Sequence, residues 1–277
     1  MSYPQPDSYG EPVPVVHLPF SALAGGPADI SVRISGRISP GGPATVVFLH
    51  GGWGHEFYPL DAAALAPVRV VIPDRSGYGG STPITALPPD FHRLAMHETA
   101  AVLDALGIDR AVWWGHSDGA VIAALAGLEI PHRTAAVVLE ALHYTAAKPG
   151  SRAFFELMAG DPDAFGPQIS ARLAAEHGDD RWRQVLRLDG RAWLDLAAAG
   201  DLDLYDGRLG TLVPPTLIIH GGQDPRTEPG ELAAITAALP RAGRSLHPQG
   251  RHSPHSERSV RRQVLADAAA FVRSLAD

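Results

Sequence analysis

The chain has no cysteine and no asparagine among its 277 residues, and Lys148 is its only lysine. Without cysteine there is no disulfide framework, no thiolate nucleophile and no thiolate ligand for a metal ion. The missing asparagine and the single lysine indicate a biased base composition in the source genome, and we attach no mechanism to them.

Positive charge and long apolar runs are also scarce. The formal net charge is −7 and no basic run could neutralise several phosphates, so we expect no nucleic-acid partner. No stretch of about 18 apolar residues is present, and residues 1–7 lack the charged and apolar segments of a signal peptide. These absences predict a soluble, cytoplasmic protein with no membrane partner.

The order of apolar segments favours a single α/β domain. With 45% hydrophobic residues, a chain of this length can bury a sizeable core as one domain. Residues 1–12, rich in proline, glycine and serine, predict a loose lead-in. Beyond them, alternating strand-like and helix-like segments are typical of a mostly parallel sheet with flanking helices. The predicted strands are 13–18, 30–35, 44–50, 68–73, 111–115, 135–140, 216–220 and 245–247, and the helices are 90–106, 117–128, 230–239 and 256–275.

Residues 141–209 interrupt this alternation. They contain no apolar strand run, and their composition favours helices at 153–158, 168–177, 181–188 and 193–199. We therefore predict a helical cap at 141–209, inserted between the two parts of an α/β core at 13–140 and 210–277. An ordinary long connection between two strands is the alternative.

The turn Gly115-His116-Ser117-Asp118-Gly119 connects an apolar strand directly to a helical run. In this setting a serine nucleophile is held in a strained conformation, and glycines flank it because side chains there would collide. The geometry exposes the serine Oγ at the carboxyl edge of the sheet. It also places the backbone N–H of Asp118 at a helix N-terminus, where it can stabilise an oxyanion. The alternative is an ordinary N-cap serine between two glycines.

A serine hydroxyl is a weak nucleophile at neutral pH and needs a histidine base oriented by a carboxylate. Asp224 follows an apolar strand run on the edge expected for Ser117, so we predict that it is the acid, with a plain turn carboxylate as the alternative. His252 precedes the final helix and is the predicted base, with His247 and His255 as close rivals. Because His252 and His255 have no third ligand nearby in the sequence, we expect no metal, and no cofactor.

The loop after the strand run at 44–50 is expected to supply a second oxyanion donor, because its glycines let the backbone bend toward the serine. Gly52 is the first candidate for this donor and Trp53 the second. Trp53, together with His143 and Tyr144 directly after another strand run, is also a candidate for substrate contact.

Five segments in this order resemble the successive landmarks of the α/β-hydrolase superfamily, from about residue 44 to the C-terminus. The resemblance implies the α/β-hydrolase fold, with Ser117, Asp224 and His252 as a catalytic triad. It also implies that the backbone N–H groups of Gly52 and Asp118 form the oxyanion hole. The segments are His50-Gly51-Gly52, Pro73-Asp74-Arg75-Ser76-Gly77-Tyr78-Gly79-Gly80-Ser81, the Ser117 turn, His220-Gly221-Gly222-Gln223-Asp224 and Gly250-Arg251-His252-Ser253-Pro254-His255.

Within that superfamily, Ser117-Asp118-Gly119 resembles the elbow of valacyclovir-hydrolase-like serine carboxylesterases. In that group the carboxylate after the serine receives a substrate ammonium group, so the resemblance implies amino-acid esters as substrates. The alternative is that the Asp118 carboxylate pairs internally, for instance with His143 or His50.

These features predict hydrolysis of a small-molecule carboxylic ester or related acyl bond through an acyl-enzyme on Ser117. The same scaffold also permits C–C bond hydrolysis or a non-hydrolytic lyase, cyclase or acyltransferase reaction, and a ligand receptor with vestigial hydrolysis is a further alternative. The sequence leaves the substrate open, and with it the choice between a monomer and a homodimer.

Overall fold

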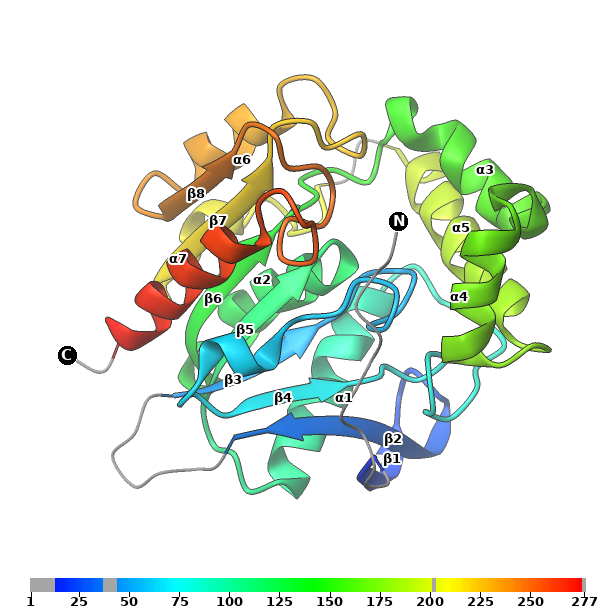
Figure 1. Ribbon diagram of the computed structural model, residues 1–277, viewed down its shortest axis with the longest axis horizontal. Coiled ribbons are helices and arrows are strands. Elements are labelled where there is room, and N and C mark those ends of the chain that lie inside the picture. Colours follow the sequence, from blue (N-terminus) through cyan, green and yellow to red (C-terminus); the bar gives the residue numbers. More distant parts are fainter. Residues whose placement is uncertain (1–12, 37–43, 201–202, 276–277) are drawn as a thin grey trace.

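The computed structural model describes residues 13–36, 44–200 and 203–275, so the lead-in predicted for residues 1–12 lies outside the described residues. Its centre is an eight-stranded sheet with the order β1-β2-β4-β3-β5-β6-β7-β8 (Figure 1). β2 is antiparallel to both β1 and β4, and every pair from β4 to β8 in this order is parallel. The mostly parallel sheet confirms the predicted fold class. The strands are β1 (Val15–Ser21), β2 (Gly26–Ser35), β3 (Thr45–Leu49), β4 (Val70–Pro73), β5 (Ala111–His116), β6 (Thr134–Glu140), β7 (Thr216–Gly221) and β8 (Gly243–His247).

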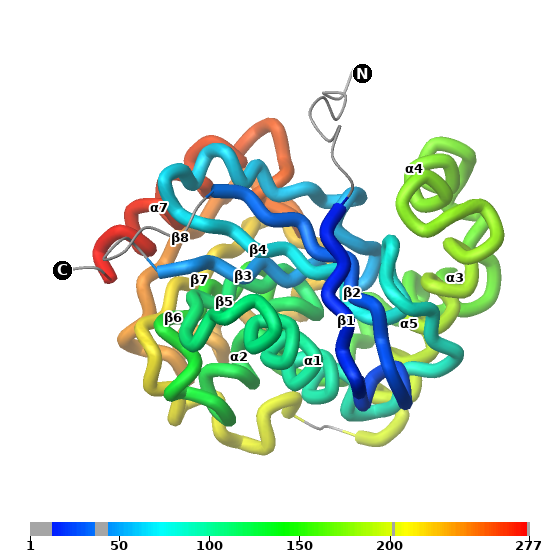
Figure 2. The backbone as a smooth tube through the Cα atoms, turned by 90° about the horizontal axis from the view of Figure 1, so that it is seen from below, coloured from blue at the N-terminus to red at the C-terminus, as the bar shows by residue number. Residues whose placement is uncertain are grey.

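Helices cover both faces of this sheet. In β3, Val47 and Leu49 belong to the core on the side of α1 and α2, whereas Val46 and Phe48 belong to the core on the side of α7. Figure 2 shows α1 and α2 next to each other and away from α7. Because both faces are buried, the parallel strands are continuously apolar rather than alternating. The helices of the core are α1 (Phe91–Ala105), α2 (Asp118–Glu129), α6 (Glu231–Ala238) and α7 (Arg261–Arg273).

Between β6 and β7 the chain forms α3 (Arg152–Gly160), α4 (Pro167–His177) and α5 (Trp182–Ala198), which we call the cap helices (Figure 1). The end of α4 is tied to the loop after β3. The Glu176 carboxyl group accepts hydrogen bonds from the N–H groups of Glu56 and Phe57, each at 3.0 Å, and His177 Nε2 donates to Trp53 O at 3.1 Å. These bonds hold the cap helices beside the loop that carries Gly52.

The prediction of two helices at 181–188 and 193–199 is wrong, because the single helix α5 runs through both. Glycine has a low helix propensity, and Gly190 lies between the two predicted segments. Gly190 allows α5 to pack closely against α3, because a Cβ at Gly190 would lie 2.7 Å from both Phe155 O and Met158 Cβ of α3. The neighbouring helix therefore requires a glycine inside α5.

The predicted start of the final helix at residue 256 is also wrong, since turns precede α7. Within these turns the Glu257 carboxylate accepts the N–H groups of Arg251 at 2.7 Å and Ser253 at 2.9 Å. Glu257 thus fixes the backbone on both sides of His252. No helix in the described parts of the chain is both long and apolar enough to cross a bilayer.

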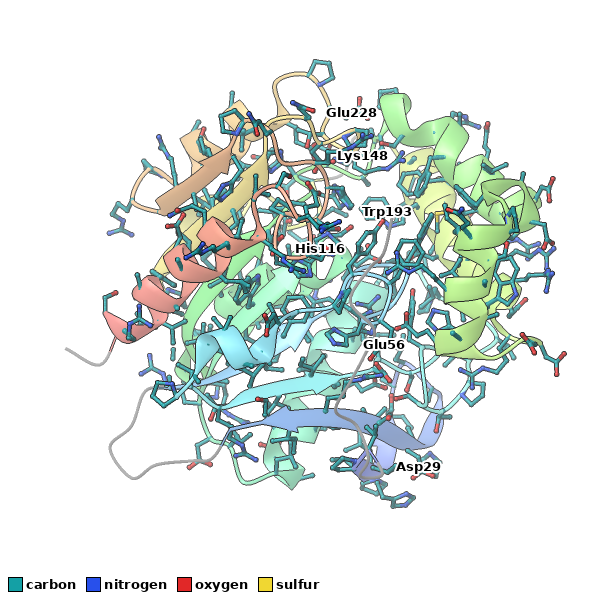
Figure 3. The ribbon with its side chains drawn as sticks, viewed as in Figure 1. Asp29, Glu56, His116, Lys148, Trp193 and Glu228 are labelled. Atoms are coloured by element: carbon teal, nitrogen blue, oxygen red, sulfur yellow. The ribbon has the colours of Figure 1, made fainter. Side chains whose placement is uncertain are left out.

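The only lysine, Lys148, is buried in an ion pair with Glu231 at the start of α6. Glu231 also accepts the N–H groups of Tyr144 at 2.8 Å and Glu228 at 2.9 Å. Figure 3 shows Lys148 close to Glu228, whose carboxylate accepts the N–H of Gly150 at 3.0 Å. The segment that leads from β6 to the cap helices is therefore joined to the loop before α6.

Candidate active site

The turn between β5 and α2 holds Ser117 in a strained backbone conformation, with φ 57° and ψ −119°. Glycines are needed on both sides of it. A Cβ at Gly115 would lie 1.8 Å from Gly119 O, and a Cβ at Gly119 would lie 2.0 Å from Leu49 O. The close approach of strand, turn and helix thus explains both glycines and orients the serine.

Three predicted residues meet in a hydrogen-bonded chain. Ser117 Oγ lies 3.1 Å from His252 Nε2, and His252 Nδ1 lies 3.0 Å from both carboxylate oxygens of Asp224. A tautomer with Nδ1–H donating to Asp224 leaves Nε2 free to accept the serine proton. Burial alone would raise the pKa of Asp224, but the His252 ring and the Arg226 N–H outweigh it and lower that pKa, which keeps the carboxylate ionised.

The two rival histidines lie elsewhere. His255 is buried, with Nδ1 2.8 Å from Glu140 Oε1 and Nε2 2.8 Å from Tyr58 O, and His247 Nε2 is 2.7 Å from Ser245 Oγ. Neither contacts the serine hydroxyl. The pair of His255 with Glu140 instead anchors the loop that carries His252.

The predicted oxyanion donors are placed around the serine. A Cβ at Gly51 would lie 3.0 Å from Ser117 Cβ, so the loop after β3 packs directly against the serine. Within the described residues, the N–H groups of Gly52 and Asp118 donate to no protein acceptor, and both residues line the cavity described below. Arg75 donates hydrogen bonds to His50 O and to Gly51 O, the latter at 3.4 Å, and so supports this loop from behind.

The predicted substrate contacts divide into two groups. His143 and Trp53 both line the cavity, and His143 Nε2 lies 3.2 Å from Ser117 Oγ. Trp53 stacks on Phe154 of α3 with ring centroids 5.5 Å apart, which forms a wall between the loop and the cap helices. Tyr144 is not among the residues that line the cavity, because its ring packs against Tyr205 with centroids 6.4 Å apart.

The Asp118 carboxylate pairs internally, but with other groups than those named from the sequence. Asp118 Oδ1 accepts Trp193 Nε1–H at 3.0 Å and lies 3.2 Å from His92 Nε2, and Arg75 is 3.7 Å from Oδ2. Burial favours the neutral acid, but His92 and Arg75 outweigh it and lower the pKa of Asp118. A further carboxyl group, Asp189 of α5, reaches the same place.

Asp189 could have been singled out in the sequence by its position in a helical repeat, although the residue composition of the segment gave no sign of it. Its position coincides with the buried stripe of α5, which repeats at helical spacing. A charged residue inside such a stripe indicates a paired or protonated group. His92 lies in the same way among the buried positions of α1, whereas Trp193 carries no comparable signal, since an aromatic residue is an ordinary member of an apolar helix face. The buried positions of α5 are Trp182, Val185, Leu186, Asp189, Gly190, Ala192, Trp193 and Leu196.

A cavity of about 2230 Å³ opens over Ser117 between the sheet edge and the cap helices. In Figure 3, Trp193 from α5 and His116 from the Ser117 turn border this region. His116 Nε2 lies 2.9 Å from His252 O, which links the serine turn to the histidine loop. No group of three or more His, Asp or Glu residues in the described ranges is arranged to hold a metal ion.

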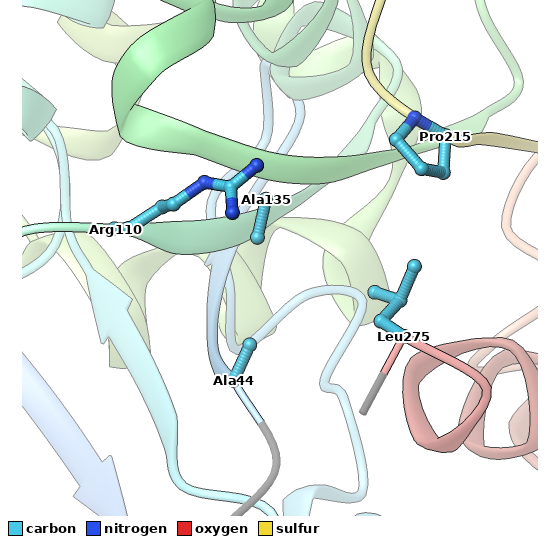
Figure 4. A pocket seen from close by; sticks show the side chains of 5 residues that line it. All are labelled: Ala44, Arg110, Ala135, Pro215 and Leu275. Carbon is cyan, nitrogen blue, oxygen red and sulfur yellow. The ribbon is translucent and has the colours of Figure 1, made fainter. Parts of the chain in front are cut away.

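A second hollow lies at the opposite ends of the strands (Figure 4). Among its described lining residues, Arg110 is the only charged one, and none of the predicted site residues is among them. Ligands of open α/β sheets bind at the carboxyl ends of the strands. The cavity over Ser117 is therefore the candidate active site. The hollow is lined by Ala44, Arg110, Ala135, Pro215 and Leu275.

Comparison with known proteins assigns the family. The model of the alpha/beta hydrolase family matches residues 46–268, and the chain therefore belongs to this family. The matched range runs from β3 into α7 and includes Ser117, Asp224 and His252.

Individual relatives are more distant. Epoxide hydrolase A of Mycobacterium tuberculosis is 37% identical over 115 residues, which cover 39% of this chain and 34% of that enzyme. A bifunctional esterase/perhydrolase of Acinetobacter calcoaceticus is 26% identical over 263 residues, which cover 83% of this chain and 92% of that protein. A thermophilic esterase of Thermogutta terrifontis, solved with malate bound, superposes with a TM-score of 0.69 at 21% identity, covering 95% of this chain and all of that one (100%). This structural likeness shows the fold alone.

Proposed function

We propose that the protein is a serine hydrolase that cleaves a small-molecule carboxylic ester, or a related acyl bond, through an acyl-enzyme on Ser117. The observation that carries this proposal is the chain of hydrogen bonds from Ser117 Oγ through His252 to Asp224, at 3.1 and 3.0 Å. Nucleophile, base and orienting acid in this order are the arrangement that activates a hydroxyl group for acyl transfer.

In the first half of the proposed reaction, Oγ of Ser117 attacks the ester carbonyl carbon while His252 Nε2 takes the serine proton. Asp224 stabilises the imidazolium that forms. The N–H groups of Gly52 and Asp118 receive the oxyanion, and the latter belongs to the N-terminus of α2, which favours negative charge. His252 then gives its proton to the leaving alcohol.

In the second half, water attacks the acyl-enzyme while His252 takes one of its protons. The tetrahedral oxyanion forms again at the same two N–H groups, and its collapse returns the proton to Ser117 Oγ. The carboxylic acid leaves and the enzyme is restored. One oxygen atom of the product acid therefore comes from water.

One comparison favours an ester as the substrate. The relative whose match covers 92% of its own length is named an esterase/perhydrolase. The Asp118 carboxylate is not expected to bind a substrate ammonium group, because its Oδ1 already contacts Trp193 Nε1 and His92 Nε2. We therefore propose an ester without specifying an amino-acid acyl group.

The covalent step is tested with a fluorophosphonate probe and mass spectrometry. We expect labelling at Ser117 that is lost in Ser117→Ala, together with a loss of about 10⁴-fold or more in kcat/KM on an aryl ester. Ser274→Ala is the control, because that exposed hydroxyl only donates to Phe271 O. Full activity of Ser117→Ala would refute the mechanism.

The alternative reactions are separated by their products. Hydrolysis in heavy-oxygen water places one heavy oxygen in the product acid. A product that contains no added water would favour a lyase, cyclase or acyltransferase, and cleavage of a carbon–carbon bond would identify a C–C bond hydrolase. Tight ligand binding that persists in Ser117→Ala, with negligible turnover in the native protein, would indicate a receptor.

A further inference from the structure

Two buried carboxyl groups meet beside the nucleophile turn. Asp118 is the first residue of α2 and directly follows Ser117, whereas Asp189 lies in the middle of α5; they are 1% and 3% exposed. The two carboxyl groups lie within hydrogen-bonding range of each other. Asp189 also packs against the loop after β3, because a Cβ at Gly52 would lie 2.2 Å from Asp189 Oδ2.

The surroundings of Asp118 stabilise its ionised form. Its Oδ1 accepts a hydrogen bond from Trp193 and contacts the ring of His92, and the Arg75 guanidinium faces its Oδ2. The N-terminus of α2 adds a further favourable field, since unpaired N–H groups carry partial positive charge there. Asp118 is therefore the carboxylate of the pair.

The surroundings of Asp189 stabilise its protonated form. It lies in the middle of a helix, far from a helix N-terminus, and its Oδ1 has no hydrogen-bond partner of good geometry among the described residues. Burial and then the Asp118 charge raise the pKa of Asp189, and they outweigh Arg75 and the Tyr78 hydroxyl, which favour the ionised form and lower that pKa. Asp118 Oδ2 likewise receives none. If both groups were ionised, two buried oxygens would stay unsatisfied, whereas one proton between the carboxyl groups satisfies both.

The net charge of the buried groups around the two carboxyls also favours a proton on Asp189. Arg75 contributes one positive charge, and His92 is neutral because burial lowers its pKa. Tyr78 is also neutral, since burial and then the nearby Asp189 raise its pKa well above the usual value. Two ionised carboxylates would leave one uncompensated buried negative charge, while a single proton on Asp189 makes the cluster neutral.

We propose that Asp189 is a positioning residue: it remains a neutral carboxylic acid whose proton is donated to Asp118 Oδ2, and this bond fixes α5 against the nucleophile turn and the Gly52 loop. The bond joins a cap helix to the residue that supplies one oxyanion N–H. The kinetic consequence rests on the proposed hydrolase function, whereas the protonation state of Asp189 does not.

The proposal predicts that kcat depends on pH in the alkaline range. Burial and then the neighbouring Asp118 charge raise the pKa of Asp189 well above its ordinary value. The charged or titratable groups that face it are Asp118 from α2 and Arg75 and Tyr78 from the loop after β4, with His92 of α1 behind Asp118. Ionisation of Asp189 breaks its bond to Asp118 and adds repulsion beside the serine, so kcat is expected to fall on the alkaline side.

The kinetic test compares two replacements. Asp189→Leu has no donor for Asp118, and we expect kcat to fall by about 100-fold through misplacement of the turn. Asp189→Asn keeps a side-chain N–H donor at every pH. Its kcat should therefore be close to that of the wild type and should no longer fall at alkaline pH. Asp195→Asn makes the same change at an exposed site of α5 and serves as the control. An Asn variant as impaired as the Leu variant, or one that keeps the alkaline limb, would refute the proposal.

A second measurement needs no turnover. The infrared difference spectrum between the wild type and Asp189→Asn at neutral pH should contain the C=O stretching band of a protonated carboxyl group. Absence of that band, with circular dichroism showing both proteins folded, would overturn the proposal even if the ester is cleaved. A wild type that shows the band but cleaves no ester would refute only the proposed function.

Discussion

His143 Nε2 lies 3.2 Å from Ser117 Oγ, the same oxygen that His252 Nε2 reaches at 3.1 Å. The two imidazole rings stack with centroids 5.9 Å apart and planes 23° from parallel. Burial and then the nearby Lys148 charge lower the pKa of His143 well below the usual value, so its ring is neutral. In the proposed reaction, a neutral ring with Nε2–H would donate to Oγ while His252 accepts the serine proton.

This arrangement predicts distinct effects for two changes at His143. His143→Phe removes one hydrogen bond to Oγ and should lower kcat by about tenfold. His143→Gln can still donate an N–H and should retain more activity. Steady-state kinetics on an aryl ester, with His252→Ala measured alongside, would check this. A loss in His143→Phe as complete as that in His252→Ala would instead make His143 the base.

A second prediction concerns Gly52, whose missing side chain leaves room for Asp189. A methyl group there would lie 2.2 Å from Asp189 Oδ2, so Gly52→Ala should displace the loop and lower kcat/KM by about 100-fold. Gly160→Ala is the matched control, because a Cβ at Gly160 meets nothing within 4 Å.

A double variant tests whether the collision with Asp189 causes the lower kcat/KM of Gly52→Ala. In an Asp189→Ala background, Gly52→Ala should add little further loss, since the colliding carboxyl group is gone. Additive losses in the double variant would show that Gly52 matters for another reason, such as the flexibility of its own backbone.

The positions of Ser117, Asp224 and His252 could be predicted because each follows a strand of one parallel sheet. β5, β7 and β8 all end at the same edge, so their order in the sequence becomes proximity in space. The glycines at 115 and 119 added a local steric signal. These are short-range features that a sequence displays directly.

The partners of Asp118 could not be predicted in the same way. His92 comes from α1, and Trp193 and Asp189 come from α5, whose continuity through Gly190 was itself missed. Which helix face meets the Ser117 turn is decided by packing between segments far apart in the chain. Propensity and motif spacing contain no information on that contact.

A third prediction follows from Glu176, whose burial, with further repulsion from Asp74 and Glu56, raises its pKa to about 8. The folded pKa lies above the unfolded value of about 4.3, so the folded state holds the proton more tightly. The stability that this proton provides is complete below the unfolded pKa and is lost as pH rises through about 8.

Glu176→Gln removes this titration. The free energy of unfolding of the wild type should fall relative to that of Glu176→Gln as pH rises from 5 to 9, as measured by urea denaturation at each pH. A constant difference across that range would contradict the prediction. Glu156→Gln is the control, because that carboxylate is exposed on α3 and pairs only with Arg152.

A fourth prediction concerns the ion pair of Lys148 and Glu231. Lys148→Met leaves the Glu231 carboxylate buried without its counter-charge and should destabilise the fold by about 3–5 kcal/mol. Adding Glu231→Gln should recover part of that loss. Arg152→Gln breaks an exposed pair on α3 and is expected to change the free energy of unfolding little. Equal effects of the buried and exposed changes would refute this account.

Because Lys148 is buried, its chemical modification would report on movements of the segment after β6 relative to α6. Its amine is the chain's only lysine side-chain amine, and it reaches solvent only when the segment after β6 separates from α6. An acylating reagent would therefore modify this position only in the separated state, and at the rate of separation when the reagent reacts faster than the segment closes again. A single mass shift at Lys148 would time how often the base of the cap helices opens, with no label introduced by mutation.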